Sequence, residues 1–115
     1  MSLESALMRR IADDVKVLVE SGTDVVLAFS TAARIIVAEA ADLGEDLATT
    51  GLAAVHGAIY AASTLAVSAE DAASAAATGA IDAAGNVSTA AAARVRDAIT
   101  GTVAGVRVIA HKTLD

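Results

Sequence analysis

The side chains best suited to chemistry in this sequence are two histidines and several pairs of adjacent acids. His56 and His111 lie far apart, and His56 has no carboxylate at the spacing of a second metal ligand. Adjacent acids such as Glu45 and Asp46 point about 100° apart on a helix, so they are not arranged to share a proton or hold a metal. No phosphate-binding loop or nucleophile motif occurs. The sequence therefore predicts a protein that is not an enzyme and has no cofactor or metal.

Basic side chains near the end of the chain are the strongest indication of a binding surface. The whole chain carries 8 Lys and Arg against 14 Asp and Glu, a net charge of −6, which argues against nucleic-acid binding. An apolar face with basic edges suits anionic lipid headgroups or an acidic partner, including a second copy of the chain. Pairing with Asp13, Asp14 and Glu20 inside a bundle is the alternative. The predicted basic edge consists of Arg94, Arg96, Arg107 and Lys112.

The elements that must position these residues are predicted to be helices. Alanine, the best helix former, supplies 31 of the 115 residues, and proline is absent. Glycines followed by Ser, Thr or Asp mark helix ends. We therefore predict a single all-α domain over residues 1–115 with long amphipathic helices, either a bundle of about four helices or extended helices that self-associate. In the bundle the helices lie near 3–20, 24–43, 46–78 and 88–113.

An apolar stripe with a period of eleven residues runs along most of the chain. Eleven residues make three helical turns at about 3.67 residues per turn, so the stripe keeps one helical phase across the predicted breaks. This persistence favours long helices lying on one surface, although bundle helices imitate the pattern over several turns. The predicted lipid- or partner-facing stripe consists of Val15, Leu18, Val26, Phe29, Val37, Val55, Ile59, Ile81, Val95, Ile99, Val103, Val106 and Leu114.

Small residues spaced four apart allow helices to approach closely. Between Ala66 and Arg94 few apolar residues are larger than alanine, so a helix there gains little from packing unless backbones come near each other. The predicted close-packing residues are Gly57, Gly101 and Gly105.

Residues 47–69 contain no Lys, Arg, Asp or Glu, and the stretch is long enough to span a bilayer. It is rich in Ala, Ser, Thr and Gly rather than Leu, Ile and Val, and acids rather than bases bracket it. A buried or surface-lying helix is therefore favoured, and a membrane-inserted oligomer through residues 47–69 is the second alternative.

The segment ITGTVAGVRVIAHKTLD, residues 99–115, is similar to the eleven-residue amphipathic repeats of synucleins, perilipins and exchangeable apolipoproteins. The likeness lies in TGTVAGV (residues 100–106) and AHKT (residues 110–113). The alanine-rich composition without proline or cysteine also resembles phasins. These resemblances imply helical proteins that coat lipid or storage-granule surfaces. Synuclein-like repeats carry lysines at the edges of the apolar face, whereas the polar face here is acidic through residue 46, which confines expected anionic-membrane binding to the C-terminal third.

We therefore expect a non-enzymatic amphipathic helical protein that coats or associates with a lipid, membrane or storage-granule surface. The alternative is a self-assembling structural bundle or filament. The expected partners are a lipid or hydrophobic granule surface, or copies of the chain itself in a homo-oligomer, and no nucleic acid. The first residues lack the apolar region of a signal peptide. We expect a cytoplasmic protein, free or peripheral on a membrane or inclusion surface.

Overall fold

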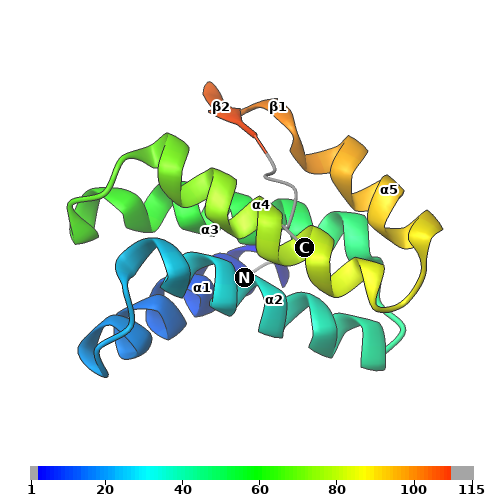
Figure 1. Cartoon of the computed structure of the whole chain (residues 1–115), viewed down its shortest axis with the longest axis horizontal. Helices are drawn as coiled ribbons and strands as arrows, with labels where there is room; N and C mark the ends of the chain where they lie inside the picture. The colour runs from blue at the N-terminus through cyan, green and yellow to red at the C-terminus, as the bar shows by residue number, and fades with distance from the viewer. Residues whose placement is uncertain (1–2, 110–115) are drawn as a thin grey trace.

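The computed structural model describes residues 3–109, which form five α-helices and a short β-hairpin (Figure 1). The all-α class and the helical bundle are confirmed, and the helices predicted at 3–20 and 24–43 match the first two observed helices. The extended form is wrong, because the helices turn back on one another. The elements are α1 (Leu3–Glu20), α2 (Val25–Asp42), α3 (Leu47–Ala62), the 3₁₀ turn η1 (Ser63–Leu65), α4 (Ala69–Gly85), α5 (Thr89–Ile99), β1 (Gly101–Val103) and β2 (Val106–Val108).

The four turns between helices share one chemical signal at the start of the next helix. A carboxylate or hydroxyl oxygen accepts a hydrogen bond from a backbone N–H two or three residues later, which satisfies a free helix N–H. The first two turns also contain Gly22 and Gly44 at φ +104° and +73°, a region that favours glycine. These turns redirect the chain, although the apolar stripe keeps its phase through them. The capping residues are Asp24, Asp46, Ser68 and Ser88.

The helix predicted over residues 46–78 is wrong, because α3 ends at Ala62. The turn η1 and then Ala66, at φ +56°, redirect the chain before α4 begins. The spanning helix considered for residues 47–69 is therefore interrupted after the 16 residues of α3. Within residues 3–109 no helix combines the length and the apolar character needed to cross a lipid bilayer.

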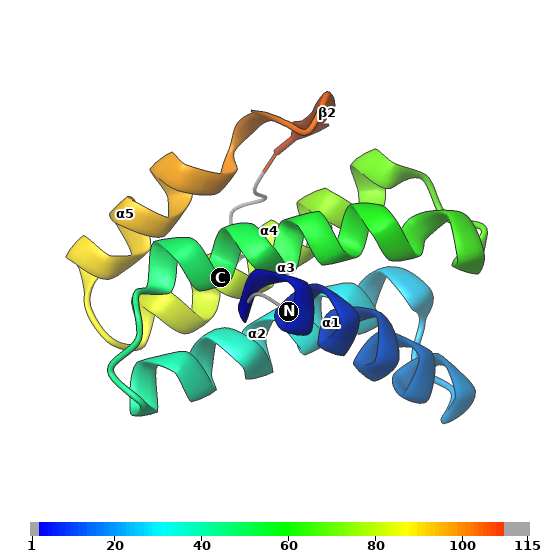
Figure 2. The same ribbon diagram turned by 180° about the vertical axis from the view of Figure 1, so that it is seen from behind.

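Helix α4 lies in the middle of the bundle, against α2, α3 and α5 (Figures 1 and 2). Most of its residues are buried, and most of the buried ones are alanine. A Cβ atom placed on Gly79 would overlap the carbonyl oxygen of Ser30, so α2 and α4 meet backbone to backbone. The only buried aromatic residue in the described chain, Phe29, lies in the same core. The core is therefore filled mainly by close approach of helices rather than by large side chains.

The helix predicted over residues 88–113 is also wrong, because α5 ends at Ile99. Thr100 has extended backbone, and Gly101 follows at φ +95°. The next residues pair as an antiparallel hairpin in which Gly101 faces Val108 and Val103 faces Val106. Its valines alternate with other residues, which suits a strand buried on one face. The hairpin is held against α4 by the backbone N–H of Ile109, which donates to Ser74 Oγ at 3.0 Å.

Candidate functional site: helix α5 and the groove beside it

The predicted apolar stripe lies mostly inside the bundle. The turns between helices preserve its phase, so each helix directs its stripe residues toward the common core. The surface expected to face lipid is therefore largely occupied by the protein itself. The buried members are Val15, Phe29, Val37, Val55, Ile81, Val95, Ile99 and Val103; the partly buried ones are Leu18, Ile59 and Val106; Val26 is exposed, and Leu114 lies outside the described residues.

The three predicted close-packing glycines have different environments. Gly57 lies against α1, where an added Cβ would come within 2.9 Å of the Met8 carbonyl oxygen. Gly101 and Gly105 belong to the hairpin, at φ +95° and +79°, and an added Cβ would meet no atom within 4 Å at either position. The close-packing role expected for Gly101 and Gly105 is therefore corrected: the hairpin requires their backbone conformation rather than their small size.

The predicted basic edge lies along α5 and the hairpin. Arg94, Arg96 and Arg107 are all exposed, and Lys112 lies outside the described residues. Among residues 3–109, Arg94 forms an ion pair with Asp46, where Nη2 lies 3.6 Å from Oδ1. The alternative pairing with acids of α1 is wrong for Asp14, which contacts Arg10 of its own helix. The described part of the basic edge therefore remains on the surface.

Helix α5 has a clear division between its faces. Val95 and Ile99 are completely buried, whereas the neighbouring arginines and Asp97 are exposed. At 3.6 residues per turn, Arg94 and Arg96 lie about 100° to either side of Val95. The helix thus has an apolar face, one arginine at each edge of that face, and an acid on the outer side. This pattern is typical of helices that lie in a lipid–water interface.

The surface beneath α5 is made of very small residues. A Cβ added to Gly51 of α3 would lie 3.1 Å from Val95 Cγ1 and 3.7 Å from the Cβ atom of Ala80. It would also lie 3.7 Å from Ile99 Cδ1. The large side chains of α5 therefore rest on a nearly flat surface where α3 and α4 meet.

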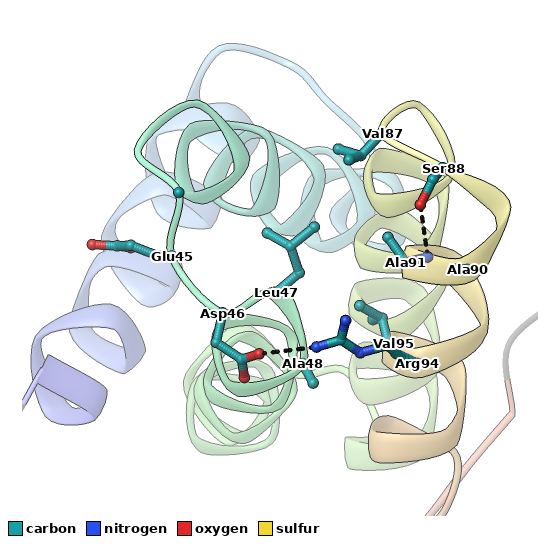
Figure 3. Close-up of a pocket in the computed structure, with 11 residues that line it drawn as sticks. Glu45, Asp46, Leu47, Ala48, Val87, Ser88, Ala90, Ala91, Arg94 and Val95 are labelled. Atoms are coloured by element: carbon teal, nitrogen blue, oxygen red, sulfur yellow. Dashed lines mark hydrogen bonds and ion pairs between the residues drawn. The ribbon is translucent and has the colours of Figure 1, made fainter.

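A groove of about 490 Å³ opens between the first turns of α3 and α5 (Figure 3). Apolar side chains from α3, α5 and the preceding turn form its walls, and Arg94 and Asp46 face each other across it. The side chain of Glu45 points away from this space in Figure 3. The apolar lining residues are Leu47, Ala48, Val87, Ala90, Ala91 and Val95.

Asp46 is already engaged in capping α3. Its Oδ2 atom accepts hydrogen bonds from the Thr49 hydroxyl at 2.6 Å and from the Thr49 backbone N–H at 2.9 Å. These bonds, followed by the nearby charge of Arg94, hold the pKa of Asp46 below its usual range. Asp46 is therefore a stable carboxylate, and the more weakly held partner in the ion pair is Arg94.

Two smaller hollows flank the exposed side chain of Tyr60 on α3. One, of about 320 Å³, is lined by α1 residues and Tyr60, and the other, of about 290 Å³, also includes His56 and Ala104 of the hairpin turn. In the described part of the chain no three His, Asp or Glu side chains gather as metal ligands. These hollows lack a charged side chain that faces its partner across the opening as Arg94 does.

The walls of the groove were not identified from the sequence. Asp46 and Ser88 carry the helix-start signal, and both are capping residues in the structure. Nothing in the linear sequence indicates that these two helix starts lie side by side. Leu47, Val87 and Ala91 consequently looked like ordinary helix and turn residues.

Comparisons of this chain with protein-family models, with curated proteins and with solved structures found no match. The argument for function therefore depends on the residues and their arrangement.

Proposed function

We propose that this protein is a non-enzymatic lipid-surface protein that attaches peripherally to anionic membranes or lipid inclusions through α5 and the hairpin. The observation that carries the proposal is the position of Arg94 and Arg96 at the two edges of an apolar face formed by Val95 and Ile99. On a lipid surface this arrangement places the guanidinium groups at the headgroups while the apolar face enters the acyl region.

Attachment requires α5 to leave the bundle, and the two sides of its interface differ in what they lose. Val95 and Ile99 carry most of the apolar area, and they exchange a protein environment for an equally apolar lipid environment. The surface left behind consists of small residues such as Gly51 and Ala80, which expose little apolar area to water. The exchange therefore needs only a modest additional attraction, which anionic headgroups supply to Arg94, Arg96 and Arg107.

The proposed attachment differs from a full coating by the eleven-residue stripe. Most stripe residues on α1 to α4 lie in the core, and adsorption through all of them would require the entire bundle to open. Attachment through the C-terminal region leaves that core intact. It also agrees with the charge distribution, because α5 and the hairpin are basic in an otherwise acidic chain. We accordingly propose no nucleic-acid partner.

Flotation with vesicles tests this proposal. The wild-type chain is expected to float with vesicles of phosphatidylglycerol and phosphatidylcholine, and much less with phosphatidylcholine alone. Each Lys or Arg near an anionic surface contributes about 1 kcal/mol, so Arg96→Gln combined with Arg107→Gln should weaken binding about thirtyfold. Arg9→Gln combined with Lys16→Gln removes two exposed charges from α1 and is the matched control.

A second variant tests whether α5 must leave the bundle. Gly51→Leu inserts a side chain where Val95 rests, so it should release α5 and strengthen vesicle binding. Circular dichroism and melting should show that the other helices persist. Equal flotation by the wild type and the two double variants, or the absence of flotation on anionic vesicles, would contradict the proposal.

The outer face of α2 favours a second candidate function, self-association into a structural assembly. Leu27 and Ile35 are 53% and 44% exposed, and Thr31 lies between them on the same face of the helix. Sedimentation over a range of concentrations should reveal an oligomer that Ile35→Glu weakens. Val87→Glu, at another exposed apolar residue, is the control. A monomer at all concentrations would eliminate this candidate.

A further inference from the structure

The groove beside α5 has the size and lining of a binding site for one apolar chain. Ligand sites in proteins commonly occupy about 300–1,000 Å³, and this groove measures about 490 Å³. Its walls come from Leu47 and Ala48 on α3, Val87 in the turn, and Ala91 and Val95 on α5. These side chains offer dispersion contacts and no hydrogen bonds, which suits a methylene chain.

The polar contact available to a ligand comes from Arg94. Its guanidinium is 74% exposed and is held by one ion pair with Asp46, at 3.6 Å, which is longer than a charge-assisted hydrogen bond. Asp46 keeps its bonds to Thr49 when Arg94 turns away, because those bonds use the other carboxylate oxygen. Arg94 can therefore exchange Asp46 for an anionic ligand without disturbing the start of α3.

The remaining polar groups at the groove are already occupied. The Asp46 side chain accepts from the Thr49 N–H, and Ser88 Oγ accepts from the Ala91 N–H at 3.0 Å. A negatively charged headgroup at this groove consequently binds through Arg94. A cationic headgroup would meet Asp46 only after displacing Arg94, and Glu45 points away from the space (Figure 3).

We infer that the groove binds a single-chain amphiphile with a carboxylate headgroup, the chain lying between α3 and α5 and the carboxylate pairing with Arg94. This inference extends the proposed function, because it names the lipid class that α5 recognises, and rests on it only in taking a lipid surface as the source of the amphiphile. Occupation of the groove also places a chain against Val95, at the contact that holds α5 on the bundle.

Calorimetric titration with dodecanoate, at concentrations where it is monomeric, tests the inference without any vesicle. The wild-type chain is expected to bind one equivalent saturably, and dodecanol should bind about tenfold more weakly, because it lacks the charge. Arg94→Gln should reduce the affinity for dodecanoate by a similar factor and leave the affinity for dodecanol unchanged. Arg96→Gln, on the opposite edge of α5, is the matched control and should bind like the wild type.

A second pair of variants tests where the chain lies. Ala91→Phe fills the groove and should abolish binding, whereas Ala93→Phe, on the exposed side of the same helix, should not. Melting curves establish that both variants are folded, and an Ala91→Phe chain that fails to fold is replaced by Ala48→Phe on the facing wall.

Each outcome decides between the two proposals. Dodecanoate binding that requires Arg94 and an open groove supports the inference even when vesicle flotation fails. Dodecanoate binding that neither Arg94→Gln nor the groove-filling variant changes, or no binding at all, overturns the inference and leaves flotation to decide the proposed function. A concentration-dependent dimer that the groove-filling variant dissociates would identify a second copy as the occupant, and would also overturn the inference.

Discussion

Helix α4 and helix α5 both cover α3, but they exclude water in different ways. Helix α4 meets its neighbours through alanines and through the backbone at Gly79, which touches the Ser30 carbonyl of α2. Helix α5 rests on the bundle through the two large side chains of Val95 and Ile99. Backbone contact allows no added atom and offers no side chain to another partner. Side-chain contact can be exchanged for a different apolar environment, and this difference makes α5 the part of the bundle suited to binding.

The largest expected effect comes from filling the contact between α2 and α4. Gly79→Leu places a side chain where the Ser30 carbonyl oxygen already lies, and the backbone has to move by ångströms rather than tenths. Overpacking of this kind destabilises by more than the usual 1–3 kcal/mol, which is a large part of the stability of a small domain. We expect a chain that is unfolded, or nearly so, in thermal and urea unfolding experiments.

Gly85→Leu is the control for this substitution. Gly85 lies at the exposed end of α4, where an added Cβ meets only the Ala92 Cβ atom at 3.8 Å. Replacing glycine in a helix removes its entropic penalty, so stability should change by less than about 1 kcal/mol and in the favourable direction. A Gly79→Leu chain as stable as Gly85→Leu would show that α2 and α4 do not meet backbone to backbone.

The second prediction compares two buried isoleucines, Ile36 on α2 and Ile99 on α5. Truncation of either to alanine removes similar apolar contact and should lower stability by about 3 kcal/mol. In Ile36→Ala the loss should appear in hydrogen exchange throughout the bundle. In Ile99→Ala it should appear mainly in α5 and the hairpin, because those elements open while α4 keeps its contacts with α2 and α3. Uniform loss of protection in both variants would place α5 in the same cooperative unit as α4.

Local signals in the sequence account for much of the fold. The first two helices were predicted closely, because glycine and Asp24 or Asp46 stand at the turns that follow them. The ends of α3 and α5 were missed for physical reasons. The break after α3 passes through Ala66 in a left-handed conformation that alanine rarely adopts, so no glycine or proline marks it. In the hairpin, Val106, Arg107 and Val108 alternate as a strand does, but this signal is only three residues long.

The candidate site was less predictable than the fold. The eleven-residue stripe identifies core residues correctly, yet the same pattern arises whether the stripe faces lipid, another chain or the protein's own interior. Only the three-dimensional arrangement shows that Val95 rests on Gly51 and that Arg94 faces Asp46. These contacts join positions more than forty residues apart, and neither helical periodicity nor capping signals relate such distant residues.

A third prediction uses one substitution in the two regions. Ala66 and Ala104 have φ of +56° and +51°, where a Cβ atom is strained by about 1 kcal/mol. Ala66→Gly and Ala104→Gly should each relieve about that amount, less the greater freedom of glycine in the unfolded chain. The gain at Ala66, between α3 and α4, should raise the melting temperature. The gain at Ala104 should slow hydrogen exchange in the hairpin without changing the melting temperature. A change in melting temperature from Ala104→Gly would join the hairpin to the main cooperative unit.

The smallest expected effect concerns two carboxylates whose charged forms are stabilised differently. Arg10 of α1 donates two hydrogen bonds to Glu39 of α2, at 2.5 and 2.7 Å, and these hold the pKa of Glu39 below its usual range. The pKa of Asp46 is lowered mainly by Thr49 of its own helix and only secondarily by Arg94. Because the folded pKa of each carboxylate lies below its unfolded value, each stabilises the fold above the unfolded pKa. That contribution disappears as the pH falls through the folded pKa.

The two pKa values should therefore respond differently to loss of the arginine partner. Arg10→Gln should raise the pKa of Glu39 toward its ordinary value and flatten the loss of stability in acid, because the helix-to-helix bond is the main cause of the shift. Arg94→Gln should leave the pKa of Asp46 low, since Thr49 remains. NMR titration of the carboxyl carbons measures both shifts. A large rise at Asp46 would mean that Arg94 is held firmly at the mouth of the groove and is not available to a ligand.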